Sequence, residues 1–158
     1  MSPYATSRGS NLMSKAHEVK LTLDGITFRG CIPLLTRKDL PQLAGIIDEH
    51  GDLIDGRDLE RFEGKTARRV RALGLHGPQT FKFCRAFSEL GVQELADLLA
   101  VDRRTISRWE HGDVEIPKPV MALVALLADE YSRGKSDLKT QLSRPPHRRP
   151  KNINVDAA

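Results

Sequence analysis

The chain has 158 residues, of which 39% are apolar and 29% charged, and its formal net charge is +4. Its longest apolar run, residues 120–128, has nine residues, about half of what a membrane-spanning helix needs. The polar first residues lack the apolar stretch of a secretion signal, and two cysteines are too few for a disulfide scaffold. We therefore expect a cytoplasmic protein that is neither membrane-spanning nor secreted.

The charges are grouped in bands along the chain. Residues 39–63 hold eight acidic residues and two arginines, whereas residues 65–85 hold six basic residues and no acid. Residues 132–158 add a net charge of +5. Such bands are found on ordinary solvated helices, and they also suit a protein with one face that meets phosphate and others that avoid it.

In chain order, residues 1–17 are polar, without apolar periodicity, and are predicted to be disordered. Apolar and polar residues then alternate on both sides of Asp24-Gly25, which is typical of a β-hairpin with a tight turn. A lone hairpin is marginally stable in water, so we expect it to pack on a helix over residues 39–50. A second helix is predicted from Arg57 to Leu73, ended by Gly74.

The next segment predicts a series of short helices. The first follows Pro78 and ends at Gly91, with an apolar face made of Phe81, Cys84, Ala86, Phe87 and Leu90. The second spans residues 92–99, and a turn at 100–102 follows it. The third runs from Arg103 to Glu110, with Asp102 as its N-cap and Gly112 as its end. Pro117 and Pro119 then introduce a longer apolar helix.

The third of these helices carries an arginine-rich polar face. Ile106 and Trp109 lie three residues apart and are expected to face the core, leaving the polar residues Arg103, Arg104, Thr105, Ser107 and Arg108 outside. A helix fits the major groove of DNA, and the arginine fork matches the O6 and N7 atoms of guanine. A solvated surface is the alternative, but only Glu110 is close enough in sequence to neutralise these arginines.

The segment 90–112 resembles the XRE (Cro/phage-repressor) family, above all in Ile106-Ser107-Arg108-Trp109-Glu110-His111-Gly112. The resemblance covers residues 79–129, about a third of the chain, and implies a five-helix DNA-binding domain of the lambda-repressor type that acts as a dimer. It implies base-reading positions at Arg103, Arg104 and Arg108, with Thr105 and Ser107 touching bases or backbone. It implies phosphate contacts at His111 and Lys118, and Gln93 stands next to the position of the family's phosphate-binding glutamine, which is Val92 here. Lys82 belongs to the basic band that we expect along the DNA backbone.

The upstream segment resembles the region before the DNA-binding domain of MqsA-type antitoxins, in residues 23–31 and 40–47. Those proteins bind zinc through two Cys-x-x-Cys pairs, whereas Cys31 stands alone here, so no metal is expected. His50, Asp52 and Asp55 are interpreted as solvated polar surface. No phosphate-binding loop, nucleophile elbow or His-Glu-x-x-His motif is present, so neither enzymatic activity nor a cofactor is expected.

The sequence thus predicts a mostly α-helical protein with a small N-terminal β-hairpin, an α+β fold. Its predicted parts are a disordered start (1–17), a dimerisation or partner-binding module (18–75), a helix-turn-helix domain (76–133) and a disordered basic tail (134–158). The predicted function is a sequence-specific transcriptional repressor that binds a palindromic operator in double-stranded DNA as a homodimer. The alternatives are an antitoxin whose acidic band binds a basic toxin, and an enzyme that acts on nucleic acid, which the lack of an acid pair disfavours.

Overall fold

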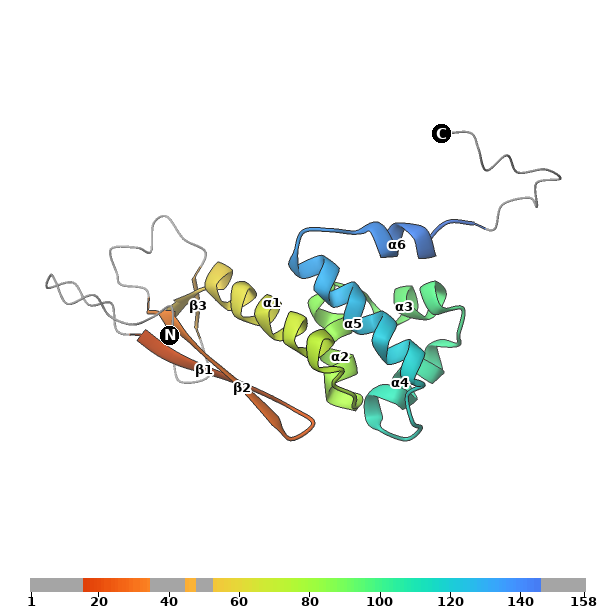
Figure 1. Cartoon of the computed structure of the whole chain (residues 1–158), viewed down its shortest axis with the longest axis horizontal. Coiled ribbons are helices and arrows are strands. Elements are labelled where there is room, and N and C mark those ends of the chain that lie inside the picture. Colours follow the sequence, from red (N-terminus) through yellow and green to blue (C-terminus); the bar gives the residue numbers. More distant parts are fainter. Residues whose placement is uncertain (1–15, 35–44, 48–52, 146–158) are drawn as a thin grey trace, which may run out of the picture.

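A computed structural model describes residues 16–34, 45–47 and 53–145 of the chain. It is mostly helical with an N-terminal antiparallel hairpin, which confirms the predicted fold class (Figure 1). The strands are β1 (Ala16–Leu23), β2 (Ile26–Pro33), β3 (Gly45–Ile47) and β4 (Leu53–Asp55). The helices are α1 (Gly56–Leu73), α2 (Pro78–Phe87), α3 (Val92–Leu99), α4 (Arg103–His111), α5 (Lys118–Ser132) and α6 (Asp137–Leu142).

The hairpin forms around the predicted turn, but β1 begins at Ala16, so the prediction of disorder over residues 1–17 is wrong at residues 16–17, which pair with β2. β1 and β2 pair antiparallel, with Leu23 opposite Ile26. The two turn residues, Asp24 and Gly25, have φ angles of 48° and 80°. A two-residue type I′ turn requires a positive φ at both positions. Asparagine, aspartate and glycine tolerate that conformation best, so the turn residues fix the register of the hairpin.

The prediction of a helix over residues 39–50 is wrong at residues 45–47. These residues form β3, which pairs antiparallel with β4, so that Ile46 lies opposite Ile54. Two adjacent β-branched residues suit a strand better than a helix, and the Leu53-Ile54 segment offers them a partner. Residues 35–44 and 48–52, which include His50 and Asp52, lie outside the described residues.

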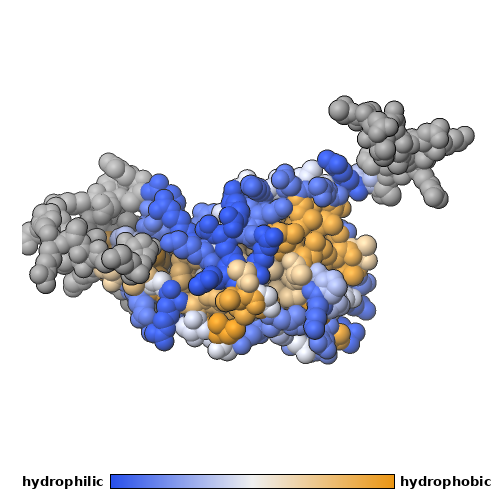
Figure 2. Space-filling model, viewed as in Figure 1, coloured by the Kyte–Doolittle hydropathy of each residue, from blue (hydrophilic) through white to orange (hydrophobic). Residues whose placement is uncertain are grey.

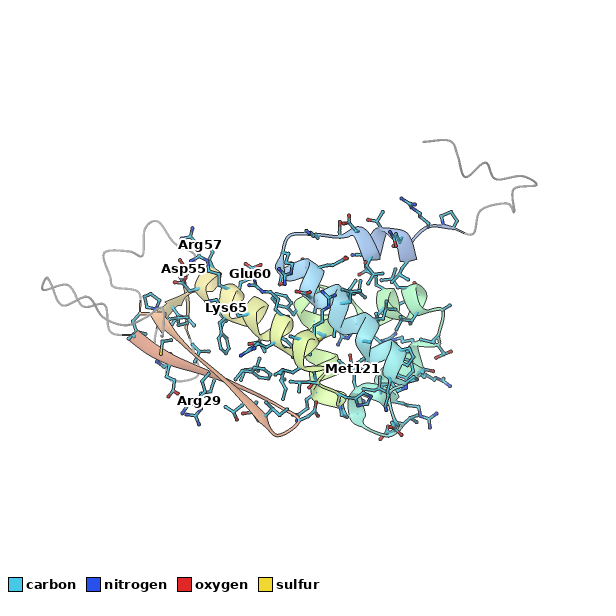
Figure 3. The ribbon with its side chains drawn as sticks, viewed as in Figure 1. Arg29, Asp55, Arg57, Glu60, Lys65 and Met121 are labelled. Atoms are coloured by element: carbon cyan, nitrogen blue, oxygen red, sulfur yellow. The ribbon has the colours of Figure 1, made fainter. Side chains whose placement is uncertain are left out.

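The hairpin packs on α1 instead of on that helix. β2 contacts α1, and a Cβ atom placed on Gly30 would lie 2.6 Å from a ring carbon of Phe62. Glycine at this position therefore allows the strand to approach the aromatic ring. At the start of α1, Asp55 caps the helix by accepting a hydrogen bond from the Arg57 backbone N–H at 2.9 Å (Figure 3).

The hairpin turn also caps the start of α2. Helix α2 begins after Gly77, which has no side chain to cap it, and Asp24 supplies the missing acceptor. The Asp24 carboxylate accepts hydrogen bonds from the backbone N–H of Thr80 at 2.8 Å and of Gln79 at 3.2 Å, and from the Thr80 hydroxyl at 2.7 Å. The Asp24 N–H donates in return to Gln79 Oε1 at 2.8 Å. A Cβ on Gly77 would lie 2.2 Å from Asp24 Oδ2, so the contact requires glycine there.

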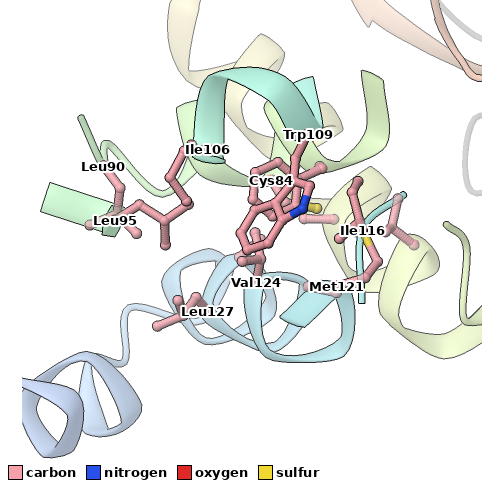
Figure 4. Close-up of a cluster of buried hydrophobic side chains, with 14 of the residues drawn as sticks. Cys84, Leu90, Leu95, Ile106, Trp109, Ile116, Met121, Val124 and Leu127 are labelled. Atoms are coloured by element: carbon pink, nitrogen blue, oxygen red, sulfur yellow. The ribbon is translucent and has the colours of Figure 1, made fainter. Parts of the chain in front are cut away.

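Helices α1 to α5 share one hydrophobic core (Figure 4). Helix α1 contributes Ala67 and Val70 to it, so α1 packs with the helices that follow as well as with the hairpin. Cys84 is fully buried in this core as predicted, and burial raises the pKa of its thiol to about 12. Ala86 was expected on the same face of α2 but is exposed.

A buried carboxylate ties α1 to α5, which run antiparallel to each other (Figure 1). Asp129 is 2% exposed and is bound by Arg71 of α1 and by Arg133, whose Nε lies 2.9 Å from Oδ1. Burial by itself raises the pKa of Asp129, but the hydrogen bonds from the two guanidinium groups outweigh it and lower the pKa below its ordinary value. The pairing therefore contributes stability near neutral pH, and this contribution is lost as the pH falls through that lowered pKa.

The prediction of a disordered tail from residue 134 is wrong over residues 137–142, which form α6. Leu138 and Leu142 pack against the core, and Lys139 pairs with Glu94 of α3 at 2.8 Å. The Glu130 carboxylate accepts the Leu138 N–H at 2.9 Å and so satisfies the start of α6. Residues 146–158 lie outside the described part of the chain. Within the described part, no helix is long and apolar enough to cross a bilayer.

The contact between Asp24 and α2 predicts a measurable loss of stability when it is removed. Asp24→Ala should lower the free energy of unfolding by about 2 kcal/mol, because it removes the cap and places alanine at a positive φ. Asp24→Asn keeps an acceptor and tolerates that φ, so it should cost less than about 1 kcal/mol. Urea unfolding of the full chain measures both. Equal losses for the two variants would contradict the capping role.

Candidate nucleic-acid interface

Helices α3 and α4 are joined by a tight turn, as the sequence predicts. Ala100 ends α3 in the left-handed conformation, with φ 54°. Asp102 caps α4, since its carboxylate accepts the Arg104 N–H at 2.7 Å. Gly112 ends α4 with φ 76°. A short helix, a three-residue turn and a second capped helix follow one another here, in the order that a helix-turn-helix has.

The buried face of α4 sets how the helix is rotated about its axis. Ile106 is fully buried and Trp109 is 5% exposed, and both point into the core from α4 (Figure 4). The ring of Trp109 meets that of Phe81 edge to face, with centroids 5.8 Å apart. These contacts hold one side of α4 against α2, so the opposite side of the helix must face solvent.

A buried ion pair reinforces the same orientation. Arg85 of α2 binds Glu110 of α4, and the two side chains are only 13% and 8% exposed. Arg85 Nη2 donates to Glu110 Oε2 at 3.3 Å, and Arg85 Nη1 donates to the Leu90 carbonyl oxygen at 2.8 Å. All three guanidinium nitrogens are thus used inside the protein. Arg85 was expected in the basic band along DNA, and the structure corrects that expectation, because its charge is neutralised by Glu110 and its side chain is only 13% exposed.

The outward face of α4 carries the predicted base-reading residues. At 100° per residue, Arg104, Ser107, Arg108 and His111 fall within about 100° of one another, opposite the buried face. Arg103 is exposed beside this face, while Thr105 and Ser107 are half-buried. Across residues 16–34, 45–47 and 53–145, no carboxylate forms an ion pair with Arg103, Arg104 or Arg108. Within the part of the chain that the structure describes, three exposed guanidinium groups of α4 are therefore not neutralised by a carboxylate.

The residues predicted to contact phosphate differ in how free their side chains are to meet DNA. Lys82 is exposed on α2. Gln93 is exposed but donates to Asp97 at 2.8 Å, and His111 Nδ1 lies 2.6 Å from the Ser107 carbonyl oxygen. Lys118 begins α5 and lines a cavity between α1 and α5. The intervening segment carries two exposed acids, Asp113 and Glu115, which disfavour phosphate at that end of α4.

Two contacts that organise this surface were missed from the sequence. Arg85 lies four residues after Phe81, and Glu110 lies four residues after Ile106, so both belong to the inward faces of their helices. That spacing was a usable signal for their burial. No local pattern connects Asp24 to α2, because 56 residues separate Asp24 from Thr80.

The described residues contain no group of three or more His, Cys, Asp or Glu side chains placed to hold a metal ion. Comparisons of the chain with protein-family models, with curated proteins and with solved structures give no match.

Removing one member of the Arg85–Glu110 pair should lower the free energy of unfolding more than breaking an exposed ion pair does. Glu110→Ala leaves the Arg85 charge buried and unpaired, and should lower the free energy of unfolding by about 3–5 kcal/mol. The combined Arg85→Met and Glu110→Leu variant removes both charges and should regain most of that loss. Arg61→Ala, which breaks an exposed pair with Asp58, is the control and should cost less than about 1 kcal/mol. A double variant as unstable as Glu110→Ala would show that the pair has no such role.

Proposed function

We propose that the chain is a sequence-specific DNA-binding regulator, acting as a repressor, that inserts α4 into the major groove of its operator. The single observation that carries the proposal is the exposed face of α4, where Arg103, Arg104 and Arg108 have no carboxylate partner within the described residues. Most other arginines of the described part are bound to acids, as Arg85 is to Glu110 and Arg71 to Asp129. Arg68, Arg69 and Arg144 also lack a carboxylate partner among the described residues, but α4 carries three such arginines within six residues, and this grouping favours an external anionic partner.

The local geometry supports base reading by arginine. An arginine fork that reaches the groove donates two hydrogen bonds to guanine O6 and N7, and each such pair contributes about 1–3 kcal/mol of discrimination. Because Asp102 fixes the first turn of α4, Arg103 and Arg104 leave the protein from a rigid helix start. Thr105 and Ser107 are half-buried neighbours of these arginines in the sequence and suit contacts to bases or backbone. Lys82 and Gln93 are the proposed phosphate contacts nearby, whereas the exposed acids Asp113 and Glu115 disfavour phosphate next to His111.

We propose further that two copies act together on a palindromic operator. One α4 offers three arginines, and contacts of about 1–3 kcal/mol each select a genomic site poorly when so few are made. A symmetric dimer doubles the number of contacts and requires two half-sites related by the same symmetry. Such a protein acts in the cytoplasm, at the nucleoid.

The antitoxin alternative depends on the acidic band, of which the structure describes residues 53–63. There Asp55 is bound to Arg57 at 3.0 Å and Asp58 to Arg61 at 3.2 Å. These neighbours neutralise part of the negative charge that would attract a basic toxin. The surface of α4 has no such internal compensation, so the regulator is the function that the described surface supports better.

Arg104 is the residue whose removal should relax base preference. After selection of bound fragments from random DNA, Arg104→Ala should lose about 1–3 kcal/mol of affinity for the selected site, mainly at one base position. Fluorescence anisotropy with the selected site and with single-base variants of it measures the loss. Arg61→Ala, on α1, is the matched control and should leave the base preference unchanged. Selection of no common motif by the intact chain would overturn the proposed function.

Removing residues 143–158 should weaken binding to all DNA to a similar extent, because this basic segment adds counterion release without base contacts. The cut falls after α6, so the packed Leu138 and Leu142 remain. Titrations at several salt concentrations should give a flatter dependence of log K on log salt than for the intact chain. If the truncation abolished base preference while Arg104→Ala did not, the roles assigned to α4 and the tail would be reversed.

A further inference from the structure

A cavity of about 570 Å³ lies between the end of α1 and the first turns of α5. Its size falls within the range of sites that hold small molecules in proteins. The antiparallel arrangement of α1 and α5 forms its two sides, and the segments 74–76 and 115–118 form its ends. It does not include the outward face of α4 and is therefore separate from the proposed DNA-binding surface.

The floor of the cavity is apolar and buried. Val70 is fully buried, and Met121 and Ala125 are 3% and 5% exposed; Figure 3 shows Met121 on α5. On the face shown in Figure 2, hydrophobic residues reach the surface in patches of the helical part, with hydrophilic residues around them. An apolar floor of this kind favours an occupant with an apolar body of comparable size.

The rim of the cavity carries charges of both signs. Glu115 and Lys118 are exposed, line the cavity and form no ion pair with each other or with another described residue. Arg71 also lines it, but its guanidinium group is bound to the Asp129 carboxylate, which Arg133 shares. His76 Nε2 lies 2.8 Å from the Ile116 carbonyl oxygen, which fixes the wall that holds Glu115. The rim thus offers one unpaired carboxylate and one unpaired ammonium group above an apolar floor.

We propose that this cavity binds a small amphipathic zwitterion of the amino-acid class, with a large apolar side chain. The side chain occupies the floor, the ligand carboxylate faces Lys118 and the ligand ammonium group faces Glu115. A purely anionic ligand would leave Glu115 unmatched, and a purely cationic ligand would leave Lys118 unmatched. An uncharged ligand would use neither group.

Three indole compounds separate these contributions, because they share one apolar ring. L-tryptophan carries both charges, tryptamine only the ammonium group and indole-3-propionate only the carboxylate. Calorimetric titration of the full chain, without DNA, should show saturable one-to-one binding of L-tryptophan. Each of the other two should bind about fivefold more weakly, the upper end for a partly exposed ion pair. Because no DNA is present, this result is independent of the proposed regulatory function.

Charge variants should give opposite patterns. Lys118→Gln should weaken L-tryptophan and indole-3-propionate about fivefold and leave tryptamine unchanged. Glu115→Gln should weaken L-tryptophan and tryptamine by the same factor and leave indole-3-propionate unchanged. Ala122 is exposed and lines the cavity, so Ala122→Trp should block all three compounds, whereas Ala86→Trp, at an exposed position of α2 outside the cavity, should block none.

The proposal is overturned if L-tryptophan shows no saturable binding. Equal affinities for the three compounds, unchanged by Lys118→Gln and Glu115→Gln, would also overturn it, because the rim charges would then have no part in recognition. Binding that survives Ala122→Trp but not Ala86→Trp would place the site elsewhere.

Discussion

The orientation of α4 depends on what its inner face contacts. Ile106 and Trp109 enter the core, and the Arg85–Glu110 pair fixes the helix to α2 beside them. The side chains of a helix are fixed around its axis, so turning one face inward turns the opposite face to solvent. Burying the face with Ile106, Trp109 and Glu110 therefore exposes Arg104 and Arg108. A charged pair that is both buried and hydrogen-bonded costs much free energy when one partner is lost. The same contacts that stabilise the core therefore decide which arginines reach solvent.

The hairpin is held to this helical body by its turn. Asp24 replaces the N-cap that Gly77 cannot provide, and it does so from a conformation that the Asp24-Gly25 turn itself requires. Because β2 also packs on Phe62 of α1, the hairpin contacts two helices of the body. A ligand that displaced the turn would remove the cap of α2. The hairpin is thus joined to the helices by its turn and by β2.

Local sequence signals predicted much of the backbone and failed where a partner decided the outcome. Asp24-Gly25 set the hairpin turn, and Asp102 and Gly112 set the two ends of α4, because capping and positive φ depend on neighbouring residues alone. The helix expected over residues 39–50 was wrong at 45–47, where pairing with β4 determines the structure. The tail over 137–142 became helical because it packs on α3 and α5.

The sequence by itself determined where α4 begins and ends and which of its residues are polar, because helix caps and the 3.6-residue repeat are local properties. It also determined that Trp109 faces inward. Only the tertiary structure decided which charges remain available, since Arg85 meets Glu110 across 25 residues and Arg71 meets Asp129 across 58. Net charge along the chain does not report such pairing. The physical reason is that the contribution of a charge depends on the distance to its partner and on burial, and folding sets both.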